Sequence, residues 1–539
     1  MNDTKSLKSI RVVSTIVFVC IITLLAWQSD DAYHAYVMAK NLVLGNGFVY
    51  NIGERATASS CPLFTLVIAA GYFVIRKMYV VSILICVVFS TLAYQIVVKH
   101  FCRTKWQIYF AFAAFVGSSC FISYTTSGLE NCQLFFLSAL FLKIYFSKET
   151  YQAKELLLLA ILISLIAMTR MDAVLMFVPM IVYLYLAKRE NVSFIKAVGL
   201  GALGLCPFIL WELFSIFYYG FPFPNTAYVK LGTDIPLIEY LYRGVQYVIT
   251  TTLCDVVLMI IPLITVIATL LLKKAKYLYL SAGIVLYGCY VLYIGGDFML
   301  GRHFTVLFFM SVICLLEMFH KEEVHIGKLE LKKAAVAALI AGIVFKGTTN
   351  DITSQFLFGS TFTSPISDER AGYFKYTSLF NNVVSYMKTG ELCVRDAWNE
   401  EGIENYRKDG FNGAIMTMVP GISIYYNNDL YLNDLYGLGD PFLSKLPAVR
   451  EENWRIGHMW RESPYGYNDS ILFGGNRIEN ESIKEYYEVI KLITRGDLFD
   501  SDRIRAVIDM NLGKYDYLLE QYKSTLDENG RQKPKEAQE

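Results

Sequence analysis

The stretch VVSTIVFVCIITLLAW at residues 12–27 runs directly into QSDD at residues 28–31, and this junction decides the fold class. The apolar run, with the residues just before it, is long enough to cross a bilayer, which takes about 17–25 residues. Lys5, Lys8 and Arg11 precede it, as basic residues precede the apolar part of a signal peptide. Since no small-x-small cleavage site follows, we expect an uncleaved first membrane span that ends at Asp30 and Asp31.

The composition extends this interpretation to most of the chain. Of the 539 residues, 55% are hydrophobic and 15% aromatic, and the mean hydropathy of +0.39 is above that of ordinary soluble domains. Apolar runs of spanning length recur as far as residue 348, so we predict a polytopic α-helical membrane protein with about eleven spans. The spans are expected near residues 11–28, 79–98, 106–124, 131–147, 155–169, 172–188, 196–217, 249–272, 277–295, 303–320 and 332–348.

The distribution of charge predicts an orientation. The apolar segment 62–75 is short, and treating it as an interfacial or re-entrant helix places five basic loops on one side of the membrane. Because cytoplasmic loops carry an excess of Lys and Arg, we expect the N-terminus in the cytoplasm and the C-terminal part outside. Residues 347–539 hold 21 Lys and Arg against 30 Asp and Glu, or 21 − 30 = −9, and the rest of the chain is basic. This pattern gives no indication of a nucleic-acid partner.

The C-terminal part is patterned like a separate domain. Strand-like runs at 414–419, 422–426 and 430–435 precede segments of helical periodicity at 481–494 and 502–523. We therefore divide the chain into a transmembrane domain at 1–348, an extracytoplasmic α+β domain at 349–528 and a disordered tail at 529–539. That domain contains one cysteine, Cys393, so it cannot form an internal disulfide, and no Cys/His pattern in the chain is typical of structural zinc.

Asp30 and Asp31 are the first candidates for chemistry. One alternative is structural: Ser29 or Asp30 would cap a helix at residues 32–44, although capping explains one of the two acids. The other alternative is general-base catalysis, in which a carboxylate deprotonates an acceptor hydroxyl. In the expected helix His34 lies four and three residues after the two acids, on the same face.

Further motifs occur in a fixed order along the chain. The first loop contains Asp30-Asp31-Ala32-Tyr33, Ala39-Lys40-Asn41-Leu42 and Gly45-Asn46-Gly47-Phe48-Val49-Tyr50-Asn51-Ile52-Gly53-Glu54-Arg55. Next come Ser127-Gly128-Leu129-Glu130, Thr169-Arg170-Met171-Asp172, Tyr218-Tyr219-Gly220 with Pro224-Asn225-Thr226, and Gly295-Gly296-Asp297-Phe298-Met299 with Arg302. The C-terminal part contains Gly437-Leu438-Gly439-Asp440-Pro441 and Gly457-His458.

In this order the motifs resemble those of bacterial GT-C glycosyltransferases over nearly the whole chain. The resemblance is closest to the terminal arabinofuranosyltransferases that use decaprenyl-phosphate-arabinose as donor. Two departures bear on the sugar: Met171 stands where the family usually has proline, and Ala58-Ser59-Ser60-Cys61-Pro62 replaces the family's Tyr-Thr-Asn/Ser-Pro run. They leave the identity of the transferred sugar open.

The resemblance implies a role for each candidate residue. Asp30 would be the general base, and Asp31 would orient it or contact the sugar. Arg170, Arg302 and Lys230 would bind the donor phosphate, with snorkelling anchors at span ends as the alternative for each. Substrate contacts would come from His34, Glu130, Asn225, Asp297 and His458. Alternatives are a helix-start charge for Glu130 and domain packing for Asp440 and His458.

The implied function is an integral membrane glycosyltransferase. It would move a sugar, with a pentose such as arabinofuranose as one candidate, from a polyprenyl-phosphate donor to a cell-envelope glycan or protein by inverting attack. The implied location is the bacterial inner membrane. No residue set is assigned to a metal, and a divalent cation is compatible with this chemistry without being required by it. The alternative function is a transporter or flippase of lipid-linked sugars, which predicts discontinuous spans with ionisable residues near the membrane midplane.

Overall fold

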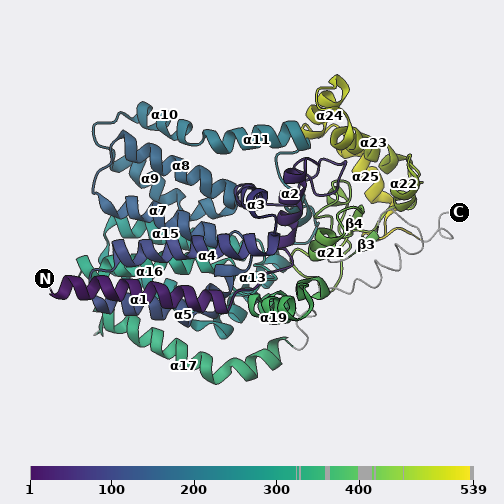
Figure 1. Cartoon of the computed structure of the whole chain (residues 1–539). Coiled ribbons are helices and arrows are strands. Elements are labelled where there is room, and N and C mark those ends of the chain that lie inside the picture. Colours follow the sequence, from purple (N-terminus) through teal and green to yellow (C-terminus); the bar gives the residue numbers. More distant parts are fainter. Residues whose placement is uncertain are drawn as a thin grey trace. The chain divides into compact units, whose positions relative to one another are not determined.

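A computed structural model describes residues 2–322, 325–326, 329–358, 365–397, 415–417, 420–452 and 454–533. The chain forms two compact units (Figure 1). Unit 1 contains residues 1–29, 79–208 and 237–391, and unit 2 contains residues 30–78, 209–236 and 392–539. The division therefore does not follow a single boundary at residue 348, because two earlier segments group with the C-terminal part.

Unit 1 is built mostly from apolar helices of different lengths (Figure 1). They are α1 (Asn2–Leu24), α4 (Met78–Ile96) with the π-helical turn η1 (Val97–Phe101), α5 (Lys105–Gly117), α6 (Ser119–Thr126), α7 (Asn131–Ser147), α8 (Ala153–Thr169), η2 (Met171–Met176), α9 (Val178–Ala187), α10 (Phe194–Gly204), α13 (Leu237–Cys254), α14 (Val256–Leu272), α15 (Ala275–Tyr293), α16 (Phe304–Lys321), α17 (Leu331–Phe358), α18 (Glu369–Thr377) and α19 (Leu379–Thr389). A short hairpin of β1 (His325–Ile326) and β2 (Leu329–Glu330) connects α16 to α17.

The helices of unit 1 are typical of a membrane protein. Within the described residues, four are long and apolar enough to cross a membrane, and up to seven spans result if each of three bent helix pairs counts as one. The prediction of a polytopic helical protein is confirmed at this level, while the count of eleven spans stays a prediction. The segment predicted as short and interfacial is α3 (Pro62–Ile75), which is apolar but shorter than a full span.

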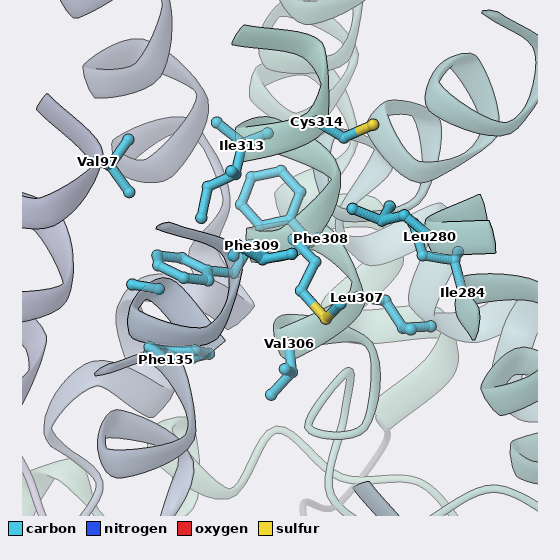
Figure 2. Packing of buried hydrophobic residues seen from close by; sticks show 14 of the residues in the cluster. Val97, Phe135, Leu280, Ile284, Val306, Leu307, Phe308, Phe309, Ile313 and Cys314 are labelled. Atoms are coloured by element: carbon cyan, nitrogen blue, oxygen red, sulfur yellow. The ribbon is translucent and has the colours of Figure 1, made fainter. Parts of the chain in front are cut away.

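The core of unit 1 surrounds α16. Every residue from Phe304 to Phe319 on this helix is buried. Figure 2 shows Phe308 and Phe309 of α16 among side chains of neighbouring helices, with Phe135 of α7 close to them. The ring centroids of Phe135 and Phe309 are 5.4 Å apart. A helix that is apolar on all sides is stable only when other helices enclose it.

Three of the predicted continuous spans are broken, which corrects the expectation for 106–124, 196–217 and 249–272, and the first and last of these breaks involve the same residue. α5 and α6 meet at an angle of 80°, and α13 and α14 meet at 108°. Asp255 joins the two breaks: its Oδ1 accepts the N–H of Leu258 in α14. Its Oδ2 accepts the Ser118 hydroxyl at 2.8 Å and the N–H of Cys120 at 2.9 Å. One carboxylate thus caps both helices that restart after a break.

We expect Asp255→Ala to lower the free energy of unfolding by about 2–4 kcal/mol, because it leaves the buried donors of two helix starts without an acceptor. The measurement is chemical denaturation of the purified protein in detergent. Asn480→Ala is the matched control: Asn480 caps a single helix through the N–H of Ile483, so its loss should cost about 1 kcal/mol. An Asp255→Ala protein no less stable than the control variant would contradict the double cap.

Unit 2 is a smaller mixed assembly. Its early elements are α2 (Ala32–Leu44), α3, the part of α11 (Cys206–Tyr219) from residue 209 onward, and α12 (Asn225–Leu231). Its later elements are η3 (Cys393–Ala397), β3 (Ile415–Thr417), α21 (Pro420–Tyr426), β4 (Leu432–Asp434), η4 (Leu443–Lys445), α22 (Tyr467–Phe473), α23 (Glu481–Arg495), α24 (Ser501–Asn511) and α25 (Asp516–Thr525). β3 and β4 pair in parallel, and the buried faces of α23, α24 and α25 belong to one apolar cluster.

Several predictions for the C-terminal part need correction. The run 422–426 is helical (α21) rather than a strand, because the carboxylate of Asp30 accepts the N–H of Ile422 in its first turn. The predicted helix 502–523 is two helices, α24 and α25, separated at Gly513 with φ +76°. Of the predicted disordered tail, residues 529–533 are described, with an isolated bridge between Leu526 and Gln532, and the rest lies outside the described residues.

Candidate functional site

Asp30 and Asp31 lie at the start of α2 in unit 2. α2 spans Ala32–Leu44 as predicted, with Asp31 at its N-cap position, but no side chain caps it. Asp30 is 4% exposed, and its Oδ1 accepts the N–H of Ile422 in α21 at 2.8 Å. One oxygen of the Asp30 carboxylate thus contacts a helix almost four hundred residues later in the chain.

His34 extends this polar region. Its Nδ1 lies 3.0 Å from the hydroxyl of Tyr50, and both side chains are buried. Burial lowers the pKa of His34, and the nearby carboxylates of Asp31 and Asp434 oppose this shift. Burial raises the pKa of Asp434, and the closeness of His34 acts in the opposite direction. His34 thus lies near Asp31, one of the two acids expected beside it, and the structure adds Tyr50 and Asp434 to this region.

The glycine-rich motif at 437–441 explains how Asp434 comes to this place. The carboxylate of Asp434 accepts three backbone N–H groups, those of Tyr436, Leu438 and Gly439. A Cβ atom at Gly439 would collide with the ring of Tyr50, so glycine permits the close approach of the motif to that ring. The motif thus fixes the carboxylate beside His34.

Asp440 has a structural role. Its Oδ1 accepts the N–H groups of Phe442 and Leu443 at 2.8 Å each, and its Oδ2 accepts the Tyr467 hydroxyl at 2.7 Å. The pKa of Asp440 is raised from 3.8 to about 7. Burial is the main cause, and the negative charge of the nearby Glu54 adds to it. The structure favours the packing alternative for this residue.

The raised pKa of Asp440 predicts a pH dependence of stability. Because folding raises the pKa, the folded protein binds this proton more tightly, and the resulting stability is complete below about pH 4 and lost as the pH rises through about 7. We expect the thermal midpoint to fall over this window and the fall to be smaller in Asp440→Asn, measured by thermal denaturation. The exposed Asp502→Asn should keep the slope of the wild type. An unchanged slope in Asp440→Asn would contradict the assignment.

The remaining predicted residues of unit 2 are Asn225, Lys230 and His458. Asn225 is 4% exposed; its N–H donates to the Thr57 carbonyl, and its Nδ2 finds no partner among the described residues. Lys230 is exposed near the end of α12 and is in a different unit from the two arginines expected to act with it. His458 packs against the ring of Tyr436 at 5.1 Å, and burial lowers its pKa to about 3.

Unit 1 contains a second cluster, centred on Glu130. This residue precedes α7, but its side chain makes no cap there. It receives a hydrogen bond from Arg170 Nη1 at 3.1 Å, and Arg302 Nη2 donates to both of its oxygens at 2.9 and 3.1 Å. Burial by itself raises the pKa of Glu130, but Arg302 and Arg170 outweigh it, and the pKa is lower than usual. Two guanidinium groups thus share one buried carboxylate.

Asp172, Asp297 and His303 complete this cluster. Arg170 Nε donates to Asp172 Oδ1 at 2.8 Å, and its Nη2 lies 3.2 Å from the ring nitrogens of His303. Asp297 Oδ2 lies 3.5 Å from His303 Nε2 and 3.9 Å from Arg302 Nη1. Its Oδ1 is buried and has no hydrogen-bond partner among the described residues. The positive φ of 81° at Gly295 and Gly296 forms the turn that precedes Asp297.

Sequence reasoning grouped Glu130, Arg170, Asp297 and Arg302 with Asp30 and Asp31; the first four lie together in unit 1, and the two aspartates belong to unit 2. It missed His303, which is 4% exposed and contacts Arg170, Asp297 and Asp172. The sequence feature that could have identified His303 is its position directly after Arg302, at the start of an apolar span. Over the residues that the structure describes, no group of His, Cys, Asp and Glu is suited to hold a metal ion.

Comparison with known proteins gives no further assignment. No family model, no curated protein and no solved structure matches this chain. The two clusters therefore carry the functional argument, together with the order of motifs along the chain.

Proposed function

We propose that this protein is an integral membrane glycosyltransferase that uses a polyprenyl-phosphate sugar as donor. The observation that carries the proposal is the Glu130 cluster of unit 1. There, Arg170 and Arg302 converge on one carboxylate, and Asp297 keeps one oxygen without a partner among the described residues. Guanidinium groups suit a phosphate, and a buried carboxylate oxygen without a donor suits a sugar hydroxyl.

The proposed reaction is an inverting displacement at the anomeric carbon. Asp30 takes the proton from an acceptor hydroxyl, whose oxygen forms a bond to that carbon while the bond from the carbon to the phosphate oxygen breaks. The leaving polyprenyl phosphate gains one negative charge. Arg170 and Arg302 stabilise this charge, which is greater in the transition state than in the bound donor.

The proposal assigns no charge-stabilising role to Lys230, since its side chain is exposed near the end of α12. Transfer on the outer face of an inner membrane, to a cell-envelope glycan or protein, follows from the predicted orientation. The proposal names the transferred sugar only as a pentose or a hexose. The reason is that the sequence departs from the family pattern at Met171 and at residues 58–62, and these departures bear on sugar specificity.

One observation favours the alternative of a transporter for lipid-linked sugars. Discontinuous spans are typical of transporters, and three helix pairs among the described residues are bent by more than 40°. The ionisable group at the sharpest of these breaks is Asp255, and both of its oxygens accept hydrogen bonds from helix starts. Because these bonds account for the carboxylate, the breaks need no transported ion to explain them.

Reconstitution distinguishes the two functions. The purified protein is placed in proteoliposomes with radiolabelled polyprenyl-phosphate arabinose, or the corresponding mannose or glucose lipids, and with an extract of cell-envelope glycan as acceptor. A transferase releases polyprenyl phosphate and forms a glycosidic product. A transporter moves the intact lipid between leaflets without forming product, and that outcome would overturn the proposal.

A further inference from the structure

The segment that follows β3 in unit 2 lies against Asp30. This segment, residues 421–428, contains most of α21 and the turn after it, and we name it the cover segment. Its Ile422 N–H donates to Asp30 Oδ1, and Gly421 lies directly against the same side chain. A Cβ atom at Gly421 would lie 2.7 Å from Asp30 Oδ2 and closer still to the carbonyl oxygen of Asp30. No residue other than glycine fits this position without moving the carboxylate or the helix.

The cover segment is fastened to α2 by several contacts besides that at Asp30. Lys40 Nζ donates to the carbonyl of Tyr425 at 2.9 Å and lies 4.7 Å from the centroid of its ring. Asn428 Nδ2 donates to Asn41 Oδ1 at 2.6 Å. Ile424 is fully buried in the apolar cluster that includes residues of α2. The segment therefore packs along α2 from its first turn to its last.

This arrangement conflicts with direct access to a catalytic base. An acceptor hydroxyl has to come within about 2.6–3.2 Å of a carboxylate oxygen to transfer its proton. A side chain that is 4% exposed, with Gly421 in contact, offers no such approach. The base must be uncovered for transfer and covered when no acceptor is present.

We propose that residues 421–428 are a mobile cover that positions the Asp30 carboxylate and shields it from water, with Gly421 as its positioning residue. The proposal rests on the proposed function, in which Asp30 is the base. In the closed state, the Ile422 amide fixes the orientation of the carboxylate. The acceptor displaces the segment from Asp30, so that water reacts slowly with the donor in the acceptor's absence.

Two variants loosen the cover in different ways. Lys40→Gln removes the ammonium group from the carbonyl and ring of Tyr425 without contacting Asp30. Gly421→Ala forces a methyl group against Asp30. Gly199→Ala in α10 is the matched control, because a Cβ atom there meets nothing within 4 Å.

The test measures access to Asp30 in the full-length protein in detergent micelles. A water-soluble carbodiimide with glycine ethyl ester labels exposed carboxylates, and peptide mass spectrometry follows Asp30. We expect labelling at least fivefold faster in Lys40→Gln and in Gly421→Ala than in wild type, with Gly199→Ala unchanged. Hydrogen exchange at the Ile422 amide should accelerate in parallel, while exchange in α23 stays constant. If Asp30 is labelled and the Ile422 amide exchanges at the wild-type rates in Lys40→Gln, the proposal of a cover is wrong.

A second readout separates this inference from the proposed function. Without an acceptor, Lys40→Gln should release sugar from polyprenyl-phosphate arabinose, or from whichever donor lipid is active, several-fold faster than wild type. If the cover exists but the protein is not a transferase, labelling of Asp30 will respond as expected and no variant will release sugar from any donor. If the protein is a transferase without a cover, hydrolysis will be the same in Lys40→Gln and in wild type.

Discussion

Replacing Asp30 by asparagine is expected to lower sugar transfer by about 10²–10⁴-fold, the usual contribution of a general base. The amide cannot take up the proton of an acceptor hydroxyl at neutral pH. Its carbonyl oxygen can still accept the Ile422 N–H, which in the wild type donates to Asp30 Oδ1 at 2.8 Å. The variant should therefore fold and lose activity, which is measured as glycosidic product formed in proteoliposomes.

The neighbouring acid provides the matched control. Asp31 is more exposed than Asp30, and no side-chain hydrogen bond to α2 depends on it. In the proposed function it orients the base or contacts the sugar, so Asp31→Asn should cost about tenfold, less than the loss of the base itself. Normal transfer by a well-folded Asp30→Asn protein would contradict the proposed mechanism.

Two different substitutions of Asp30 also test whether the start of α21 depends on the carboxylate of this residue. Since the carboxylate of Asp30 holds the first turn of α21, Asp30→Ala should lose protection of the Ile422 amide in hydrogen exchange, while Asp30→Asn should keep most of it. Activity and packing at this residue can thus be separated by the choice of substitution.

Local features of the sequence predict individual helices well and their junctions poorly. α2 begins and ends where predicted. It ends at Gly45, which adopts the left-handed conformation with φ +85° that glycine commonly takes after a helix. Hydropathy did not reveal the breaks between α5 and α6 or between α13 and α14. Both depend on Asp255, whose partner Cys120 is 135 residues away in the chain. A single polar residue in an apolar run is compatible with a continuous span as well as with a break.

The same limit applies to the clusters. Glu130, Arg170 and Arg302 could be grouped from the sequence because each lies at the end of a predicted span on one side. The sequence could not show that one carboxylate pairs with both arginines, because this pairing depends on side-chain directions across three helix ends. Asp434 was missed for a related reason: only the folded motif that follows it brings its carboxylate close to His34.

The pairing at Glu130 leads to the second large expected effect. Glu130→Ala should lower the free energy of unfolding by about 3–5 kcal/mol, since it leaves two largely buried guanidinium groups without their shared carboxylate. Chemical denaturation in detergent measures the change. The control is Glu488→Ala, which removes an exposed pair with Lys491 on α23 and should cost less than about 1 kcal/mol. Equal losses in both variants would show that the Glu130 cluster is not a buried ionic core.

Glu130→Ala also tests whether the two arginines can hold a phosphate. In the wild type the carboxylate occupies the place between them, so inorganic phosphate should stabilise the wild type weakly. In Glu130→Ala that place is vacant, and phosphate that binds the folded state raises its stability in proportion to the logarithm of its concentration. We therefore expect phosphate, against chloride at equal ionic strength, to recover more stability in Glu130→Ala than in wild type. A further replacement of Arg302 by methionine should abolish the recovery. If phosphate stabilises both proteins equally, it does not bind in the place that Glu130 occupies between Arg170 and Arg302.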